Sequence, residues 1–430
     1  MSELNMQLFR AYDIRGSVQD LSPQAITAIA LALCEDFRQA GQTRLTLGYD
    51  ARLDSPHYAQ IIADVFLQAG FDVCIIGQCS TPLMYFTAQS FDGNGIMVTA
   101  SHNPKKDNGI KWIRQSLPAT AEHIQHIGKQ AQHFWTQAQH FRPTLSRWQF
   151  AARSQLTWAY QQYQQWILQD IQLQRSFRVV LDGLHGSAGR IAQRLLQALG
   201  CHVICLRCHA DGHFPDHAPD PSIARHLTRI QQQVIAQNAD LGIALDGDGD
   251  RLVLIDEHGS ILNADRSLCL FAEICLQHPH GKKREFIYDV KCSNMVQHTV
   301  ERLAGQATMI RTGSSFLRSY LQHHADTAIF AGEFSGHYAF ADGRGLAFDD
   351  AIYAALRVME YLSQTQRSLA DVMQQYPIRA SSEDIYLAKH GYDFAHLSTA
   401  LQQFAQQCHA HVRLIDGIRL DFAHGFMTLR

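Results

Sequence analysis

The sequence has little net charge and lacks any long apolar run. Its 37 lysines and arginines nearly balance 40 aspartates and glutamates, which leaves a net charge of −3. No global electric field therefore favours nucleic acid or an anionic membrane as a partner. No stretch approaches the roughly 18 apolar residues of a transmembrane helix, and the opening "MSELNMQLFRAYDIRG" has no apolar core of signal-peptide length. These absences predict a cytoplasmic protein that binds neither membranes nor nucleic acid.

The ten cysteines lack the regular spacing of a disulfide framework, which indicates a reducing compartment. The densest group, "CHVICLRCHADGH", begins at Cys201 and could offer zinc ligands. However, Cys201 and Cys205 fall within an apolar, strand-like run, and no second C-x-x-C motif occurs in the chain. We therefore interpret these cysteines as small buried hydrophobic residues.

The chain has 430 residues, which is too long for one compact core and predicts three or four domains, at about 100–200 residues each. Helical and strand-like patterns alternate from residue 22 onward, and the alternation recurs from residue 178 and from residue 285. Such alternation is typical of mostly parallel sheets covered by helices on both faces. The last segment changes character, with a helix over 394–410 followed by a hairpin.

These patterns predict an α/β protein of three successive mixed-sheet domains and a short, incomplete α+β domain at the C-terminus. Composition shifts and turns place the boundaries so that the predicted domains are 1–148, 149–258, 259–376 and 377–430.

The strongest chemical signal is "ALDGDGDRLVLID", in which Asp246, Asp248 and Asp250 alternate with glycines after an apolar run. Residues at i, i+2 and i+4 of an extended chain point the same way, so three carboxylates converge. A hard divalent cation is their natural partner, whereas the alternative is a solvated acidic turn. Arg251 follows directly and either faces phosphate oxygens or balances the acidic cluster.

A similar spacing occurs in "FAGEFSGHYAF", where Glu333, Ser335 and His337 follow another apolar strand. An acceptor, a hydroxyl and an imidazole on one face suit recognition of a polyhydroxyl compound, although a surface loop explains the segment as well.

A serine, Ser101, lies in a turn, "TASHNP", after the apolar run 96–98. The turn differs from the G-x-S-x-G elbow of acyl-transferring hydrolases. His102 is a poor base for Ser101, because neighbouring side chains in an extended segment point apart. A serine that carries a phosphoryl group fits better, since the carboxylates and a metal ion would then meet phosphate oxygens.

Together these stretches resemble the α-D-phosphohexomutases, and most closely their phosphomannomutase/phosphoglucomutase branch. The likeness covers nearly the whole chain, and its motifs come in the family's order: "FRAYDIRG" (9–16), "TASHNP" (99–104), "NGIKW" (108–112), "DGDGDR" (246–251), "DVKCS" (289–293) and "GEFSGH" (332–337).

The resemblance implies four domains around a central cleft and an enzyme that interconverts hexose 1-phosphate and hexose 6-phosphate of mannose, glucose or both. Hexose 1,6-bisphosphate would be intermediate and activator, and the chain would be a monomer or a weak dimer. One Mg²⁺ per chain would be held by Asp246, Asp248, Asp250 and phosphorylated Ser101. The implied catalytic residues are Ser101, Lys111, Arg15 and His102, with Lys111 assisting proton transfer where nearby cations lower its pKa. The implied substrate-binding residues are Tyr12, Arg251, Lys291, Glu333, Ser335, His337 and Arg430.

The sequence departs from the family pattern at two places. Ser314, in "RTGSSF", stands where the family usually has histidine, and the printed chain ends at Arg430, the first residue of a phosphate-binding loop in family members. The C-terminal domain is therefore expected to be truncated and the activity reduced. Two alternatives stay open: a catalytically weakened sugar-phosphate-binding protein, and a phosphatase that uses the same metal site.

Overall fold

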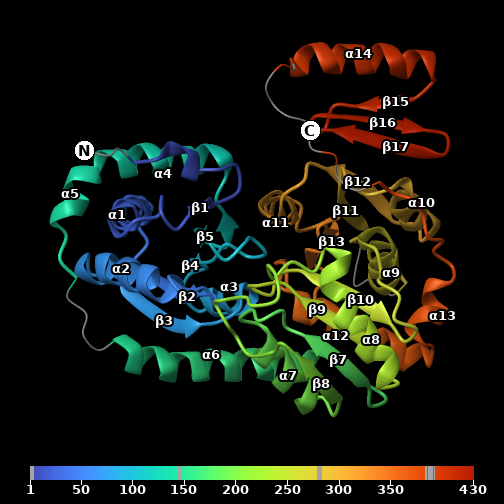
Figure 1. Ribbon diagram of the computed structural model, residues 1–430, viewed down its shortest axis with the longest axis horizontal. Coiled ribbons are helices and arrows are strands. Elements are labelled where there is room, and N and C mark those ends of the chain that lie inside the picture. The colour runs from blue at the N-terminus through green and yellow to red at the C-terminus, as the bar shows by residue number, and fades with distance from the viewer. Residues whose placement is uncertain (1–3, 144–147, 278–282, 383–384, 386–390, 392) are drawn as a thin grey trace.

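The computed structural model describes residues 4–143, 148–277, 283–382, 385, 391 and 393–430. They form three α/β units in sequence and a small C-terminal unit, each built on its own β-sheet (Figure 1). Within this part of the chain, no helix is both long and apolar enough to span a membrane. The predicted fold class, three mixed-sheet α/β units and a short α+β unit, is confirmed.

The first sheet has the order β1-β5-β4-β2-β3, with β6 paired to β5. β2, β3 and β4 run parallel, whereas β5 is antiparallel to both β4 and β1. The strands are β1 (Ile14–Ser17), β2 (Arg44–Tyr49), β3 (Asp72–Gln78), β4 (Gly95–Val98), β5 (Asp107–Arg114) and β6 (Leu117–Pro118). The helices are η1 (Met6–Leu8), α1 (Pro23–Gln39), α2 (Ser55–Gln68), α3 (Thr81–Ala88), α4 (Ala121–His133) and α5 (Trp135–His140).

Alternating side chains of β3 enter different cores, as the two-residue period of a strand requires. Val73 and Ile75 pack with α1 and α2. Cys74 and Ile76 pack with α3 and with α6 (Trp148–Asp170), a helix that leads into the second unit. The first sheet is therefore covered on both faces, and one of its cores continues into the neighbouring units.

The second sheet has the order β10-β9-β7-β8, in which only β10 is antiparallel. Every residue of its central strand β9 is buried, as expected for a strand covered on both faces. The strands are β7 (Arg178–Asp182), β8 (His202–Leu206), β9 (Leu241–Leu245) and β10 (Leu252–Asp256). The helices are α7 (Gly189–Ala198), η2 (Ala224–Leu227) and α8 (Thr228–Ala236).

The third sheet has the order β12-β11-β13-β14, again with one antiparallel edge strand, β14. Its core contains stacked aromatic rings, with the centroids of Phe286 and Phe330 4.6 Å apart. The strands are β11 (Glu285–Asp289), β12 (Gln306–Ile310), β13 (Ala328–Gly332) and β14 (Tyr338–Phe340). The helices are α9 (Ala264–Leu276), α10 (Asn294–Arg302), α11 (Ser314–His323), α12 (Ala351–Thr365) and α13 (Leu369–Met373).

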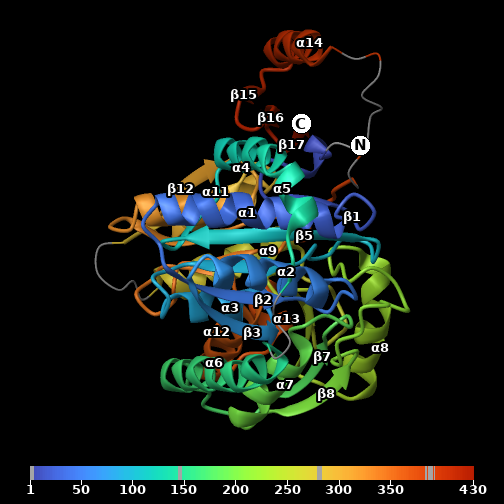
Figure 2. The same ribbon diagram turned by 90° about the vertical axis from the view of Figure 1, so that its left-hand side faces the viewer.

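The C-terminal unit projects from one end of the molecule in both views (Figures 1 and 2). It consists of α14 (Phe394–Gln407) over a three-stranded antiparallel sheet of β15 (His411–Arg413), β16 (Ile418–Phe422) and β17 (Gly425–Leu429). Arg419, on β16, is fully buried and donates hydrogen bonds to the carbonyl oxygens of Val290 and Cys292, at 2.5 and 2.6 Å. This contact ties the unit to the loop that follows β11.

The cysteines of the candidate zinc group lie in the second unit. Cys201 and Cys208 are buried in a hydrophobic core, and burial raises the pKa of the Cys201 thiol to about 11. A neutral thiol is a poor metal ligand, which agrees with their interpretation as small hydrophobic residues.

A buried hydrogen bond joins α6 to α12 and offers a test of how the units are held together. The Tyr163 hydroxyl donates to Asp350 Oδ2 at 2.7 Å, and Asp350 also caps α12 by accepting from the amide of Tyr353. Burial raises the pKa of Asp350 to about 6, so the carboxylate is mostly ionised at pH 7.5 and depends on its donors.

Tyr163→Phe should lower the free energy of unfolding by about 1.5–3 kcal/mol at pH 7.5, the range for a hydrogen bond to a charged group. Tyr160→Phe, one turn earlier on α6, is the matched control, because no described residue accepts a hydrogen bond from the Tyr160 hydroxyl. Calorimetric unfolding of both variants checks the difference. Equal stability of the two would mean that the Tyr163–Asp350 bond contributes nothing.

Candidate active site

The segments that carry the predicted serine, aspartate and glutamate site residues follow the carboxyl ends of parallel strands. Ser101 follows β4, the aspartates follow β9 and Glu333 follows β13. In open α/β sheets, this edge is where ligand sites form. The three units turn these edges toward one another, so residues far apart in the chain share one site.

The turn after β9 brings Asp246, Asp248 and Asp250 together. One oxygen of each lies within 4.8 Å of the others, and all three residues are fully buried. Asp246 Oδ1 accepts hydrogen bonds from the amides of Gly249, Asp250 and Arg251 at 3.0–3.1 Å, which wraps the backbone tightly around it. Burial, together with the neighbouring Asp250 and Asp248, raises the pKa of Asp246 well above its usual value.

This cluster suits a hard divalent cation. Asp248 Oδ1 is buried without a hydrogen-bond partner among the described residues, and an uncompensated buried carboxylate oxygen is costly. Three carboxylates with a nearby hydroxyl make an all-oxygen donor set, which Mg²⁺ prefers. A solvated acidic turn, the alternative interpretation, does not agree with complete burial.

Ser101 contacts the carboxylate cluster directly. Its Oγ donates to Asp246 Oδ2 at 2.6 Å, and its amide donates to Thr99 Oγ1 at 2.8 Å. The residue adopts a left-handed backbone conformation, with φ of 51°. The serine is 1% exposed and lies at the base of a cleft.

His102 lies closer to Ser101 than an extended chain allows. Its Nδ1 is 3.3 Å from Ser101 Oγ, because the positive φ of Ser101 turns the two side chains toward each other. The assumption of an extended segment was therefore wrong. Burial, with the positive charges of Arg251 and Arg15, lowers the pKa of His102 and keeps the imidazole neutral.

Lys111, on β5, is the counter-ion of the acidic turn. Its Nζ lies 2.9 Å from Asp248 Oδ2 and 2.8 Å from Asp250 Oδ2. Burial alone would lower the pKa of Lys111, but the two carboxylates outweigh it and raise the pKa well above its usual value. The lowered pKa that a proton-accepting role requires is absent while Lys111 is paired in this way.

A cleft of about 330 Å³ opens above Ser101, between the first and third units. Arg15, on one wall, donates to Asn103 Oδ1 at 2.7 Å and pairs with Asp13. Ser314, the first residue of α11, lines the opposite wall. The predicted site residues that line this cleft are Tyr12, Arg15, Ser101, His102, Lys111, Arg251, Glu333, Ser335 and His337.

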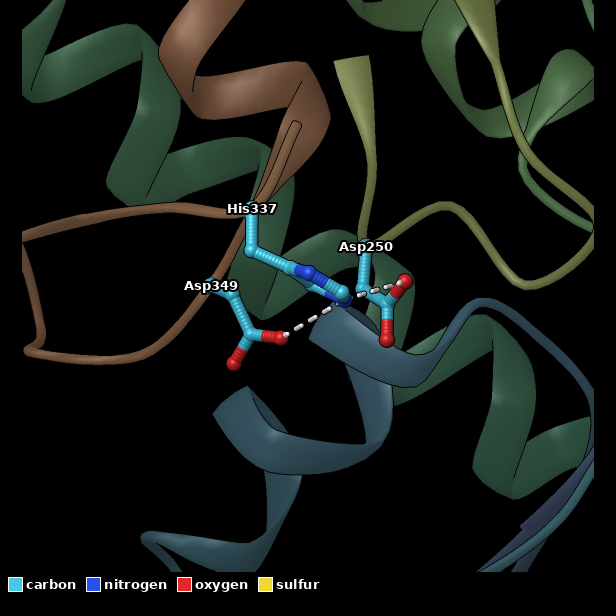
Figure 3. A group of neighbouring side chains, drawn as sticks. All are labelled: Asp250, His337 and Asp349. Atoms are coloured by element: carbon cyan, nitrogen blue, oxygen red, sulfur yellow. Dashed lines mark ion pairs between the residues drawn. The ribbon is translucent and has the colours of Figure 1, made fainter. Parts of the chain in front are cut away.

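The segment after β13 forms a buried wall of the cleft, so its interpretation as a surface loop was wrong. Glu333 is 2% exposed and accepts a hydrogen bond from Ser335 Oγ at 2.7 Å. His337 Nδ1 lies 2.8 Å from Glu333 Oε2, and its Nε2 lies 3.3 Å from Asp250 Oδ1 and 3.8 Å from Asp349 Oδ2 (Figure 3). Burial lowers the pKa of His337, but Asp250 and Glu333 more than offset this effect and raise it to about 10.

Two predicted substrate-binding residues lie outside the lining of this cleft. The Lys291 ammonium is 5.6 Å from the centre of the Phe334 ring. Arg430 Nη2 lies 2.6 Å from Asp416 Oδ2, which also accepts from the amide of Thr312. Thr312 lines the cleft, so Asp416 and Thr312 connect Arg430 to it.

Sequence reasoning missed several residues of this site. Thr81, at the start of α3, donates from its hydroxyl to Asp248 Oδ2 at 2.6 Å. Arg318, on α11, lines the cleft with its guanidinium 4.0 Å from the centre of the Tyr85 ring and 3.6 Å from Asp349. Thr81 begins a helix shortly after β3, so a search of the residues that follow each strand could have found it, whereas nothing local marks Arg318.

Comparison with known proteins agrees with this architecture. The chain matches the phosphoglucomutase/phosphomannomutase α/β/α domains I, II and III at residues 6–135, 161–259 and 263–379. It is 34% identical over 425 residues to a phosphomannomutase/phosphoglucomutase of Pseudomonas putida, covering 98% of this chain and 88% of that protein. It is 31% identical over 436 residues to a phosphoglucomutase of Neisseria meningitidis, covering 100% of this chain and 91% of that protein.

Among solved structures, a phosphoglucomutase/phosphomannomutase family protein from Burkholderia thailandensis superimposes with a TM-score of 0.85 at 31% identity, covering 98% of this chain and 90% of that one. A structure from Thermus thermophilus, at 17% identity and a TM-score of 0.78, shares the fold. Matches to all three domains, and relatives aligned over most of their own length, show that this chain belongs to the phosphoglucomutase/phosphomannomutase family of the α-D-phosphohexomutase superfamily and is an enzyme of that type.

Proposed function

We propose that this enzyme interconverts hexose 1-phosphate and hexose 6-phosphate, of mannose, glucose or both, through a phosphoryl group on Ser101. The observation that carries the proposal is the 2.6 Å contact between Ser101 Oγ, which lines the cleft, and Asp246 of the buried carboxylate cluster. A serine placed there can hold a phosphoryl group beside a cation site and remain shielded from water.

Asp246, Asp248, Asp250 and phosphorylated Ser101 would hold one Mg²⁺, which when bound withdraws negative charge from the phosphoryl oxygens. Arg15 and Lys111 place two more positive charges at the same end of the cleft. Charge on a transferring phosphoryl group is spread over its oxygens, so several fixed cations around it stabilise the transition state.

The transfer breaks the bond between phosphorus and Ser101 Oγ and forms a bond to the free hydroxyl oxygen of the hexose phosphate. The hydroxyl proton leaves as the new bond forms. Lys111 is our candidate to carry this proton, since another cation on Asp248 and Asp250 would remove its ion pairs and lower its pKa. The resulting hexose 1,6-bisphosphate turns end for end and returns its other phosphoryl group to Ser101.

The third unit would recognise the sugar. Glu333 and Ser335 offer an acceptor and a hydroxyl to sugar hydroxyl groups, and His337 holds Glu333 in place from 2.8 Å. The remaining proposed ligands are cations and a phenol near the cleft that suit the second phosphate: Tyr12, Arg251, Lys291 and Arg430.

The role of Lys111 as resident counter-ion predicts competition with Mg²⁺. Lys111→Met should tighten Mg²⁺ binding at least about threefold, because a positive charge near the site no longer opposes the ion. It should also lower the melting temperature of the metal-free protein. Asp248→Asn should do the reverse and weaken Mg²⁺ binding at least about tenfold.

Titration calorimetry of the two variants, with Lys106→Met as an exposed control of equal charge change, measures these affinities. Weaker Mg²⁺ binding by Lys111→Met than by the parent would contradict the proposed competition between Lys111 and Mg²⁺. Unchanged binding by Asp248→Asn would reject the metal site.

The function is tested by supplying glucose 1-phosphate or mannose 1-phosphate with Mg²⁺ and a trace of hexose 1,6-bisphosphate, and by measuring hexose 6-phosphate. Ser101→Ala should reduce turnover at least about a thousandfold, the scale for loss of a nucleophile, with little change in melting temperature. Ser90→Ala, an exposed serine on the same unit, should retain parental turnover.

Parental turnover in Ser101→Ala would refute the phosphoserine. Release of inorganic phosphate in place of hexose 6-phosphate would identify a phosphatase, and binding without conversion would identify a sugar-phosphate-binding protein.

A further inference from the structure

We infer that Arg52 is a positioning residue for the reaction, because it specifies the backbone of the loop that carries Ser101. The inference rests on the proposed role of Ser101. Arg52 follows β2 in the segment "GYDAR", at the same sheet edge as the serine loop. Its side chain is 1% exposed, so every donor of its guanidinium must find a partner within the protein.

Four of its N–H groups donate to carbonyl oxygens of one loop. Nη2 donates to Ser101 and Asn103 at 2.8 and 2.7 Å, and Nη1 donates to Pro104 and Asp107 at 2.8 and 2.9 Å. Backbone carbonyls buried in an irregular loop lack the partners that a helix or strand supplies. One planar group therefore donates to four carbonyl oxygens of this loop, those of Ser101, Asn103, Pro104 and Asp107.

The fifth donor links this group to the other side of Ser101. Nε donates to Asp50 Oδ2 at 3.1 Å, and the same oxygen accepts from Thr99 Oγ1 at 2.8 Å. Thr99 Oγ1 in turn accepts the amide of Ser101 at 2.8 Å. The amide and the carbonyl of Ser101 are thus both held by a network that contains the Asp50–Arg52 pair.

This network explains how Ser101 keeps its unusual backbone conformation. A φ of 51° in a residue other than glycine is strained and persists only where the surroundings impose it. The conformation directs Oγ to Asp246 at 2.6 Å. A relaxed loop would leave the serine in the protein but move its oxygen away from the carboxylate cluster.

The same segment also aligns the first unit with the second. The Arg52 guanidinium lies 5.4 Å from the centre of the Phe214 ring, and a Cβ added to Gly212 would meet the carbonyl oxygen of Ala51 at 2.4 Å. Arg52 therefore sits between the serine loop and the unit that supplies the aspartates. Lysine cannot replace it, because an ammonium group offers three donors from one point and cannot span four carbonyl oxygens.

The test compares Arg52→Lys with Arg266→Lys. Arg266, on α9, is also buried and also donates to two carbonyl oxygens, those of Tyr376 and Met373, both at 2.9 Å. Both variants should lower the melting temperature. Arg52→Lys should reduce kcat at least about a hundredfold, the scale for a misplaced reacting group, while KM changes less than about threefold. Arg266→Lys should leave kcat unchanged within about threefold.

An equal effect of the two substitutions on kcat would overturn the inference. A second pair of variants, with smaller changes, tests the inference if Arg52→Lys does not fold. Thr99→Val removes the hydroxyl between Asp50 and the Ser101 amide and should reduce kcat at least about tenfold. Thr99→Ser keeps that hydroxyl and should recover most of the loss, whereas equal activity of the valine and serine variants would contradict the network.

Amide hydrogen exchange separates this inference from the proposed function. Peptides covering residues 99–107 should exchange faster in Arg52→Lys than in the parent or in Arg266→Lys, whatever reaction the enzyme catalyses. A parent without mutase turnover would refute the function alone. Unchanged exchange in Arg52→Lys would refute the positioning role alone.

Discussion

Buried negative charge is the constraint on which the rest of this site depends. Asp246, Asp248 and Asp250 share one turn without exposure to water, and like charges at this distance repel strongly in a low-dielectric interior. Lys111, from the first unit, partly neutralises this charge through ion pairs with Asp248 and Asp250. The unpaired Oδ1 of Asp248 leaves an oxygen that suits a divalent cation. The acidic turn is therefore buried and neutralised by contacts from the units that surround it, and no unit could bury it alone.

The contacts of the three aspartates show how the units combine. The first unit supplies Lys111, Thr81 to Asp248 and Ser101 to Asp246, and the third supplies His337 to Asp250. Ser101 and His337 lie where the chain leaves the parallel strands β4 and β13, Thr81 begins α3 after β3, and Lys111 lies within β5. The sheets thereby bring together the serine that we propose carries the phosphoryl group, the cations around it and the wall that we propose binds the sugar.

Much of this arrangement could be predicted from local patterns. The two-residue spacing of the aspartates predicts convergence, and strand–helix alternation predicts the three α/β units. Long-range partners could not be predicted, because Thr81 and Asp248 are 167 positions apart and the sequence around one does not indicate the other. His102 was misplaced by the assumption of an extended chain, since a positive φ at a serine has no sequence signature. The raised pKa of Lys111 also depends on its two distant carboxylate partners.

The proposed mechanism requires that the phosphoryl group of Ser101 moves to a sugar hydroxyl. A single turnover of enzyme carrying a radioactive phosphoryl group on Ser101, mixed with excess unlabelled hexose phosphate and Mg²⁺, tests this claim most directly. The label should leave the serine and appear first in hexose bisphosphate. Label that stays on the protein, or appears as inorganic phosphate without passing through a sugar, would contradict it.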